Sequence, residues 1–275
     1  MEKWRSRPSP CGSTDRLIRT RFIAAVLTAV TLVPSRANAW PADLSQRIAR
    51  DALKLVPQSL SELFLAHQAE IFADARISKM PALPLVYADL PQGRLGAPTQ
   101  AALAQEFTER VKDLHGSDFR AALIALGSTY RLAVDLADPS LGLGMGADGR
   151  AKAIRREFYL FTTASLDKIP VVLVEPDSMR IKLEDLPAFL AGVAAKTPDQ
   201  AARLREEGIE DGRVVAASEI DFRSPIFAVS STSYSRSVNA VAATWIAIWR
   251  AAGGDMRRVK PPRIVSPRPF GLKEN

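Results

Sequence analysis

Cysteine and histidine, the side chains that most often build disulfides and zinc centres, are nearly missing from this sequence. Its 275 residues include one cysteine, Cys11, and two histidines, His67 and His115. One cysteine cannot close an intrachain disulfide, and two histidines cannot supply several imidazoles to a metal site. Aromatic residues make up only 7% of the chain, whereas 47% of it is hydrophobic. The chain is therefore expected to fold around one substantial core.

The N-terminal region has an apolar segment that is too short for a membrane-spanning helix. Residues 22–33 are twelve in number, and as a helix they would cover about 18 Å of a hydrocarbon core about 30 Å thick. Residues 1–39 carry seven basic and two acidic side chains and end in Ala37-Asn38-Ala39. This pattern is typical of a secretory signal peptide. We therefore expect cleavage behind Ala39, a mature chain that begins at Trp40, and a periplasmic or secreted protein.

The net charge of +7 comes mainly from this N-terminal region. Residues 40–275 contain 30 basic and 28 acidic side chains, and so balanced a surface gives no clear signal for a nucleic-acid partner. Residues 257–275 hold six basic residues and four prolines. Such a composition predicts an extended basic tail behind the folded domain.

Between residues 40 and 256 most apolar residues recur at helical spacing, which predicts a single mainly α-helical domain. Helices are expected over residues 44–56, 59–71, 99–111, 119–134, 154–161 and 186–195, from 197 onward, and over 234–252. Ser59 with Glu62 is predicted to cap the second helix and Ser117 or Asp118 the fourth, and Gly253-Gly254 is predicted to end the last one. The proline-rich segment 77–98 and the glycine-rich segment 139–149 are predicted to be loops. Residues 171–174 and 179–183 are predicted to form a small β-hairpin insertion.

Three segments of the mature chain carry a resemblance to a known family. The first runs from Ala39-Trp40 through residues 48–57, and the second runs from Leu126-Gly127 to Pro139. The third runs from Tyr234 to Asp255 and includes Trp245 and Trp249. In this order, behind the expected cleavage site, they resemble the zinc-dependent phospholipase C and single-strand nuclease superfamily over most of residues 40–255.

The resemblance implies a helical domain that holds three zinc ions in a cleft. In that family the free amino group and the carbonyl of an N-terminal tryptophan bind one zinc ion, and Trp40 matches this tryptophan. Asp135 and Glu157 match two carboxylate ligands. Four positions where the family has histidine are occupied instead by Ser45, Arg131, Leu141 and Ala153. A further aspartate of the family has no counterpart within residues 77–89.

These replacements remove the nitrogen ligands that zinc prefers. Leucine and alanine donate nothing to a metal, and arginine stays protonated. We therefore expect no bound zinc and no zinc-dependent hydrolysis, which makes the chain a pseudoenzyme. Arg131 stands four residues before Asp135, one helical turn away. One hypothesis is that its guanidinium replaces the lost metal charge beside Asp135 and also beside Glu157. The alternative is an ordinary exposed ion pair that contributes ~0.5 kcal/mol.

The sequence favours an exported, metal-free protein whose old cleft binds an anionic small molecule or a phospholipid. Arg131, Arg155 and Arg156 are the candidate ligand-binding residues, although Arg155 and Arg156 also fit a solvated helix face. A second hypothesis is an active phosphoric ester hydrolase with a reduced zinc site. That site would be made of Trp40, Asp135 and Glu157 with His67 or His115.

If the two histidines are not metal ligands, we expect His67 to lie in the core and His115 to cap a helix C-terminus. A third hypothesis is an envelope interaction protein that uses the basic tail. These hypotheses differ in metal content, in activity on phosphodiesters and in the salt dependence of binding.

Overall fold

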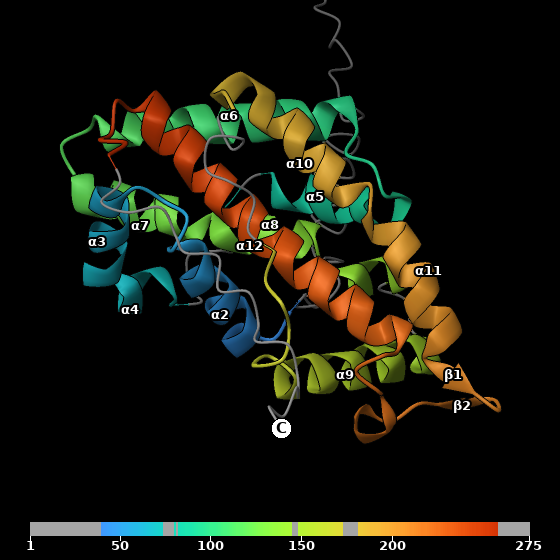
Figure 1. Ribbon diagram of the computed structural model, residues 1–275. Coiled ribbons are helices and arrows are strands. Elements are labelled where there is room, and N and C mark those ends of the chain that lie inside the picture. The colour runs from blue at the N-terminus through green and yellow to red at the C-terminus, as the bar shows by residue number, and fades with distance from the viewer. Residues whose placement is uncertain (1–39, 74–79, 81, 145–147, 173–180, 258–275) are drawn as a thin grey trace, which may run out of the picture. The chain divides into compact units, whose positions relative to one another are not determined.

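The computed structural model describes residues 40–73, 80, 82–144, 148–172 and 181–257, and these form a mainly helical domain (Figure 1). The expected signal peptide and nearly all of the basic tail lie outside the described residues. Labels follow Figure 1, in which the first described helix is α2.

The first half of the described domain is a series of helices. Their bounds are α2 Ala42–Ala52, α3 Gln58–Ala66, α4 Gln68–Ile71, α5 Leu83–Asp89, α6 Ala97–Leu114, α7 Phe119–Ser128 and α8 Tyr130–Leu136. A 3₁₀ turn, η2, covers Leu90–Gln92 and a second, η3, covers Pro139–Leu143. Most of the expected helices are therefore present.

The second half of the domain contains the longest helix. The bounds are α9 Gly149–Ala164, η4 Leu183–Asp185, α10 Leu186–Ala194, α11 Thr197–Glu207, β1 Ile209–Glu210, β2 Arg213–Val214, η5 Ala217–Glu219 and α12 Pro225–Ala251. The Ser224 hydroxyl accepts a hydrogen bond from the amide of Phe227 at the start of α12. Gly253, with a φ of 73°, follows its end and matches the predicted glycine stop.

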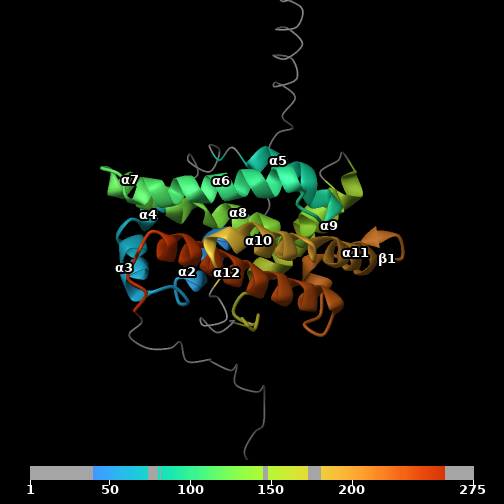
Figure 2. The ribbon, with the colours of Figure 1, turned by 90° about the horizontal axis from the view of Figure 1, so that it is seen from above.

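Helix α12 is the centre of the core. It contacts α2, α6, α8, α9, α10 and α11, which Figures 1 and 2 show arranged around it. Its buried residues include many small ones, such as Ala240, Ala243 and Ser237. Small side chains let neighbouring helices approach on several sides, while Trp245 fills the space beside Phe64. Residues 240–249 of the helix are therefore buried on every side, whereas its first half buries one face.

Two predicted helices are each broken into two by the tertiary structure. The segment expected to be one helix over 59–71 is divided at His67 into α3 and α4, and the segment 119–134 is divided at Thr129 into α7 and α8. Thr129 is buried, and its hydroxyl donates to the Leu126 carbonyl at 2.7 Å. This bond competes with the helical ladder and marks the break.

Some helices begin as the sequence predicts, and others do not. Asp118 caps α7 by accepting a hydrogen bond from the amide of Ala121 at 2.9 Å, as predicted. The capping box at Ser59 was wrong, because the Ser59 hydroxyl donates to the Asp255 carbonyl instead. The loop predicted over 77–98 was also wrong where the structure describes it. Pro84 and Pro98 lie in the first turns of α5 and α6, where a proline costs the helix no hydrogen bond.

The β-hairpin lies at a different place from the one predicted. Of the segment predicted to form it, residues 173–180 lie outside the described residues, and residues 171, 172, 181 and 182 are not in strands. The observed hairpin pairs Ile209 with Val214 and Glu210 with Arg213. Its turn residues Asp211 and Gly212 have φ values of 49° and 78°. Two positive φ angles are what a tight two-residue hairpin turn requires.

Candidate functional site

A chain of buried hydrogen bonds begins at the backbone of Trp40. The Ser45 hydroxyl donates to the carbonyl oxygens of Trp40 and Pro41, at 3.1 and 3.0 Å. The same hydroxyl accepts a hydrogen bond from Nη1 of Arg131 at 2.8 Å. Trp40 and Ser45 are fully buried, and Arg131 is 6% exposed. The start of α2 is thus tied to α8 through polar contacts inside the core.

The chain of contacts continues from Arg131 to Asp135. Nε of Arg131 lies 3.3 Å from Oδ1 of Asp135, and the Tyr87 hydroxyl on α5 donates to Oδ2 of Asp135 at 2.5 Å. Oδ1 itself is buried and receives no hydrogen bond of good geometry. We refer to Trp40, Ser45, Tyr87, Arg131 and Asp135 together as the Arg131–Asp135 network.

Burial dominates the electrostatics of the Arg131–Asp135 network. It raises the pKa of Asp135 from 3.8 to about 7, against the opposing effects of the Arg131 charge and the Tyr87 hydrogen bond. The nearby Asp138 carboxylate raises the pKa slightly further. A carboxylate that is removed from water loses hydration which one imperfect ion pair does not fully replace. Asp135 is therefore poised to change its charge near neutral pH.

A second buried cluster lies beside the first one. The fully buried carboxylate of Asp138 accepts hydrogen bonds from the Tyr159 hydroxyl at 2.7 Å and from the Ser140 amide at 2.8 Å. Burial raises the pKa of Asp138, and it raises the pKa of Tyr159 well above 10. The Trp40 ring lies 5.7 Å from the Tyr159 ring, and its Nε1 is buried without a hydrogen-bond partner. Trp40 thus connects the two clusters.

Helix α9 contributes different side chains to this region from those that the resemblance implies. The implied pair is Ala153 and Glu157. Instead, Arg155 and Tyr159 face the second cluster, and Arg155 donates to the carbonyls of Ser140 and Gly144 at 3.1 and 3.0 Å. Arg155 and Tyr159 have the same spacing of four residues, displaced by two positions.

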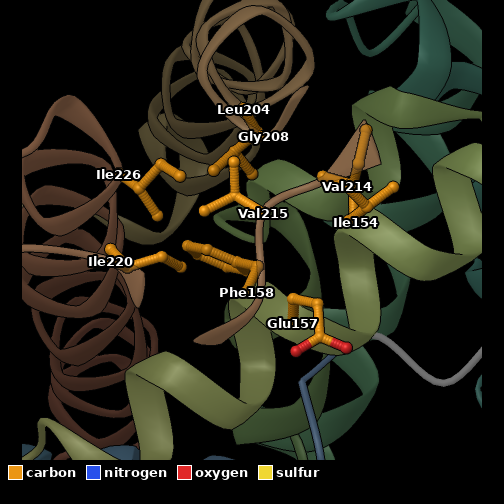
Figure 3. A pocket seen from close by; sticks show the side chains of 9 residues that line it. All are labelled: Ile154, Glu157, Phe158, Leu204, Gly208, Val214, Val215, Ile220 and Ile226. Carbon is orange, nitrogen blue, oxygen red and sulfur yellow. The ribbon is translucent and has the colours of Figure 1, made fainter. Parts of the chain in front are cut away.

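Glu157 is held away from the buried clusters. Its carboxylate accepts a hydrogen bond from the Ala217 amide at 3.0 Å and pairs with the exposed Arg156 at 2.6 Å. The Ala217 hydrogen bond, followed by that of Arg156, lowers the pKa of Glu157. The hypothesis that Arg131 also neutralises Glu157 gains no support from these contacts. Glu157 lies instead beside a small apolar pocket (Figure 3).

This pocket is lined by apolar side chains of α9, α11 and α12 and of the segment that follows α11, as Figure 3 shows. Ile220 and Ile226 lie on one side of it, and Ile154 and Val214 lie on the other. It has room for about one water molecule. It is therefore too small to hold a phospholipid or a nucleotide.

The three arginines predicted to bind an anionic ligand are not brought together. Inside the core, Nη1 of Arg131 donates to Ser45 and Nε of Arg131 pairs with Asp135. Arg155 donates to two backbone carbonyls, and Arg156 is exposed beside Glu157. These contacts give Arg131 and Arg155 internal roles and leave Arg156 on a solvated helix face.

The two histidines also lie apart from Asp135 and Glu157. His67 is partly exposed between α3 and α4, 3.3 Å from Glu70, so its expected place in the core was wrong. His115 follows the last residue of α6, as predicted. Within the described ranges, no cluster of three or more histidine, cysteine, aspartate or glutamate side chains could hold a metal ion.

Sequence reasoning missed three participants of the buried clusters: Tyr87, Asp138 and Tyr159. Tyr87 lay in a segment predicted to be a loop, so no helix face could be assigned to it. Asp138 is three residues after Asp135, which was a usable signal for a shared helix end. Tyr159 lies one turn after Arg155 and directly follows Phe158, which is buried.

Two further findings concern membrane-spanning helices and similarity to known proteins. Among the described residues, the helices are all too short or too polar to cross a lipid bilayer. Comparison of the chain with models of protein families, with curated proteins and with solved structures gives no match.

Proposed function

We propose that this chain is an exported, metal-free protein of the phospholipase C and nuclease type, which acts by binding rather than by hydrolysing phosphodiesters. One observation carries the proposal. Trp40, Ser45, Arg131 and Asp135 are four positions where the resemblance implies zinc ligands, and they contact one another in the core. Ser45 and Arg131 are 86 residues apart in the sequence. A fortuitous alignment of motifs would seldom bring such positions together.

The side chains at these positions do not fit zinc. The guanidinium of Arg131 lies between the Ser45 hydroxyl and the Asp135 carboxylate, where it supplies a fixed positive charge. A protonated guanidinium repels a cation and has no lone pair to offer. The Trp40 carbonyl, a zinc ligand in the family, accepts a hydrogen bond from Ser45. The proposal is that Arg131 takes over the charge-balancing role of a metal and that hydrolysis is lost.

Metal analysis of the exported protein tests this proposal. The full chain is expressed with its N-terminal segment in a host that exports it, and intact mass identifies the mature N-terminus. After dialysis against zinc and then against zinc-free buffer, we expect a mass that starts at Trp40 and far less than one equivalent of zinc. We also expect background hydrolysis of bis(p-nitrophenyl) phosphate. Two or three tightly bound zinc ions, or zinc-dependent turnover, would contradict the proposal.

Replacing Ser45 and Arg131 by histidine tests whether these two positions correspond to zinc-ligand positions of the family. The double variant Ser45→His with Arg131→His places two imidazoles beside Asp135 and the Trp40 backbone. We expect this variant to retain zinc that the wild-type protein does not retain. The matched control is Arg156→His, which adds an imidazole on the exposed face of α9, where zinc retention should stay at the wild-type level. Equal zinc retention by the double variant and the control would remove the support from the resemblance.

A further inference from the structure

Arg236, in the middle of α12, carries a positive charge that the described part of the protein does not balance. Its side chain is mostly buried, yet within the described ranges no carboxylate lies within ion-pair distance of it. Two other buried or partly buried arginines differ in this respect, and Arg155, which has no ion pair among the described residues either, lies close enough to Asp138 to lower the pKa of that carboxyl. Arg131 has Asp135, and Arg110 has both Glu106 and Asp113. A buried charge without a counter-ion is costly, so its retention calls for an explanation.

The hydrogen-bond partners of Arg236 are all neutral. Nη2 donates to the side-chain oxygen of Gln200 on α11 and, at 3.5 Å, to the carbonyl of Ala137. Nε is buried and has no partner, and Nη1 has none among the described residues. Burial lowers the pKa of Arg236 to about 10, with no nearby charge to offset it. The guanidinium therefore remains charged at neutral pH and keeps unused donors.

Gln200 is oriented by its neighbours in a way that leaves its own donor available. Its side-chain oxygen accepts hydrogen bonds from Arg236 and from the Ser233 hydroxyl, the latter at 3.0 Å. Its amide nitrogen makes no hydrogen bond within the described residues. A guanidinium next to a primary amide is a donor set that suits the oxygens of a carboxylate or a phosphate. Helices α11 and α12 lie side by side and hold this pair between them.

From these contacts we infer that Arg236, with Gln200, forms a binding site for a small oxyanion, a carboxylate or a phosphate, where α11 meets α12. The bound anion supplies the negative charge that Arg236 lacks. The site differs from the arginines predicted from the sequence, because Arg131 pairs with Asp135 and Nη2 of Arg155 donates to the carbonyls of Ser140 and Gly144. It is also independent of the metal question, since neither Arg236 nor Gln200 contacts the Arg131–Asp135 network in the described structure.

Thermal shift and calorimetric titration with inorganic phosphate test this inference. The wild-type protein, Arg236→Gln and the control Arg156→Gln are compared at pH 7.5 and at constant ionic strength, after metal ions have been removed on a chelating resin. We expect millimolar phosphate to raise the Tm of the wild type and of the control. We expect Arg236→Gln to bind roughly 10- to 100-fold more weakly. Without phosphate, its Tm should equal or exceed that of the wild type, because an unbalanced charge has been removed.

Titrations with other anions identify the source of the oxyanion. Acetate in place of phosphate tests a carboxylate ligand, and vesicles of phosphatidylglycerol against phosphatidylcholine test a lipid headgroup. Arg236→Lys retains the charge and tests whether the planar guanidinium is needed. The inference is overturned if wild type and Arg236→Gln respond equally, or if no anion in any arm binds the wild type. If Arg236→Gln does not fold, Arg236→Lys replaces it in the comparison, and anion binding by this variant as tight as that of the wild type overturns the inference that the guanidinium binds the anion. Zinc found in the wild type would contradict the proposed function and leave these outcomes unchanged.

Discussion

Replacing Arg131 by methionine tests the central feature of the structure, a buried guanidinium between Ser45 and Asp135. Methionine keeps much of the side-chain volume but removes the charge and every donor. In the folded wild-type protein at pH 8, Asp135 is mostly ionised and is paired with Arg131 at 3.3 Å. Breaking a buried pair from one side costs about 3–5 kcal/mol. For a domain of this size, that loss lowers the Tm by roughly 6–20 °C.

The cost of Arg131→Met should depend on pH in a defined direction. Because the Arg131 charge lowers the pKa of Asp135, removing it raises that pKa further above 7. At pH 5 Asp135 is protonated in the wild type and in the variant, so no ion pair is lost. The variant then loses mainly the hydrogen bond to Ser45, which contributes about 1 kcal/mol. We expect the destabilisation to shrink from several kcal/mol at pH 8 to about 1 kcal/mol at pH 5.

Urea unfolding followed by tryptophan fluorescence at the two pH values measures this difference. The matched control is Arg156→Met, because the Arg156 side chain is 72% exposed beside Glu157. It should change the free energy of unfolding by less than about 0.5 kcal/mol at either pH. Adding Asp135→Asn completes a double-mutant cycle that isolates the pair. A loss below about 1 kcal/mol at both pH values would refute the structural role of Arg131 and make the pair equivalent to an exposed one.

Three further predictions follow from individual contacts. Since burial raises the pKa of Asp135 from 3.8 to about 7, its contribution to stability is complete below about pH 4 and is lost as pH rises through 7. Between pH 4 and pH 8, the stability of the wild type relative to Asp135→Asn should therefore fall by up to about 4 kcal/mol in urea titrations. Ser45→Ala leaves a buried guanidinium N–H and the Trp40 carbonyl without this partner, and should cost about 1–3 kcal/mol by the same assay. The control Thr108→Ala, on an exposed face of α6, should cost less than about 0.5 kcal/mol, and equal losses would contradict the role of Ser45. Gly93→Ala forces a side chain onto a φ of 64° and against Pro198, which should cost about 1–3 kcal/mol in thermal denaturation; an unchanged Tm would show that this close approach is not maintained.

Much of the helical architecture could be predicted from residue order alone. Apolar spacing identified α2, α6, α9 and α12, because each buries a periodic set of side chains whatever its partner is. The Asp118 cap and the Gly253 stop are local chemistry, and both are present. Even the relation between Arg131 and Asp135 could be anticipated, because four residues make one helical turn.

Other features were decided only by the tertiary structure. The breaks at His67 and Thr129 and the conversion of a proline-rich segment into α5 depend on what packs against them. So does the role of Arg131, because its burial and its bond to Ser45 come from a helix 86 residues away. Tyr87 reaches Asp135 from 48 residues before it, and Arg236 has no carboxylate within ion-pair distance among the described residues, although the chain contains 30 acidic residues. Local spacing determines which side chains share a helix face, whereas burial, which sets the cost of every charge, exists only once distant helices have met.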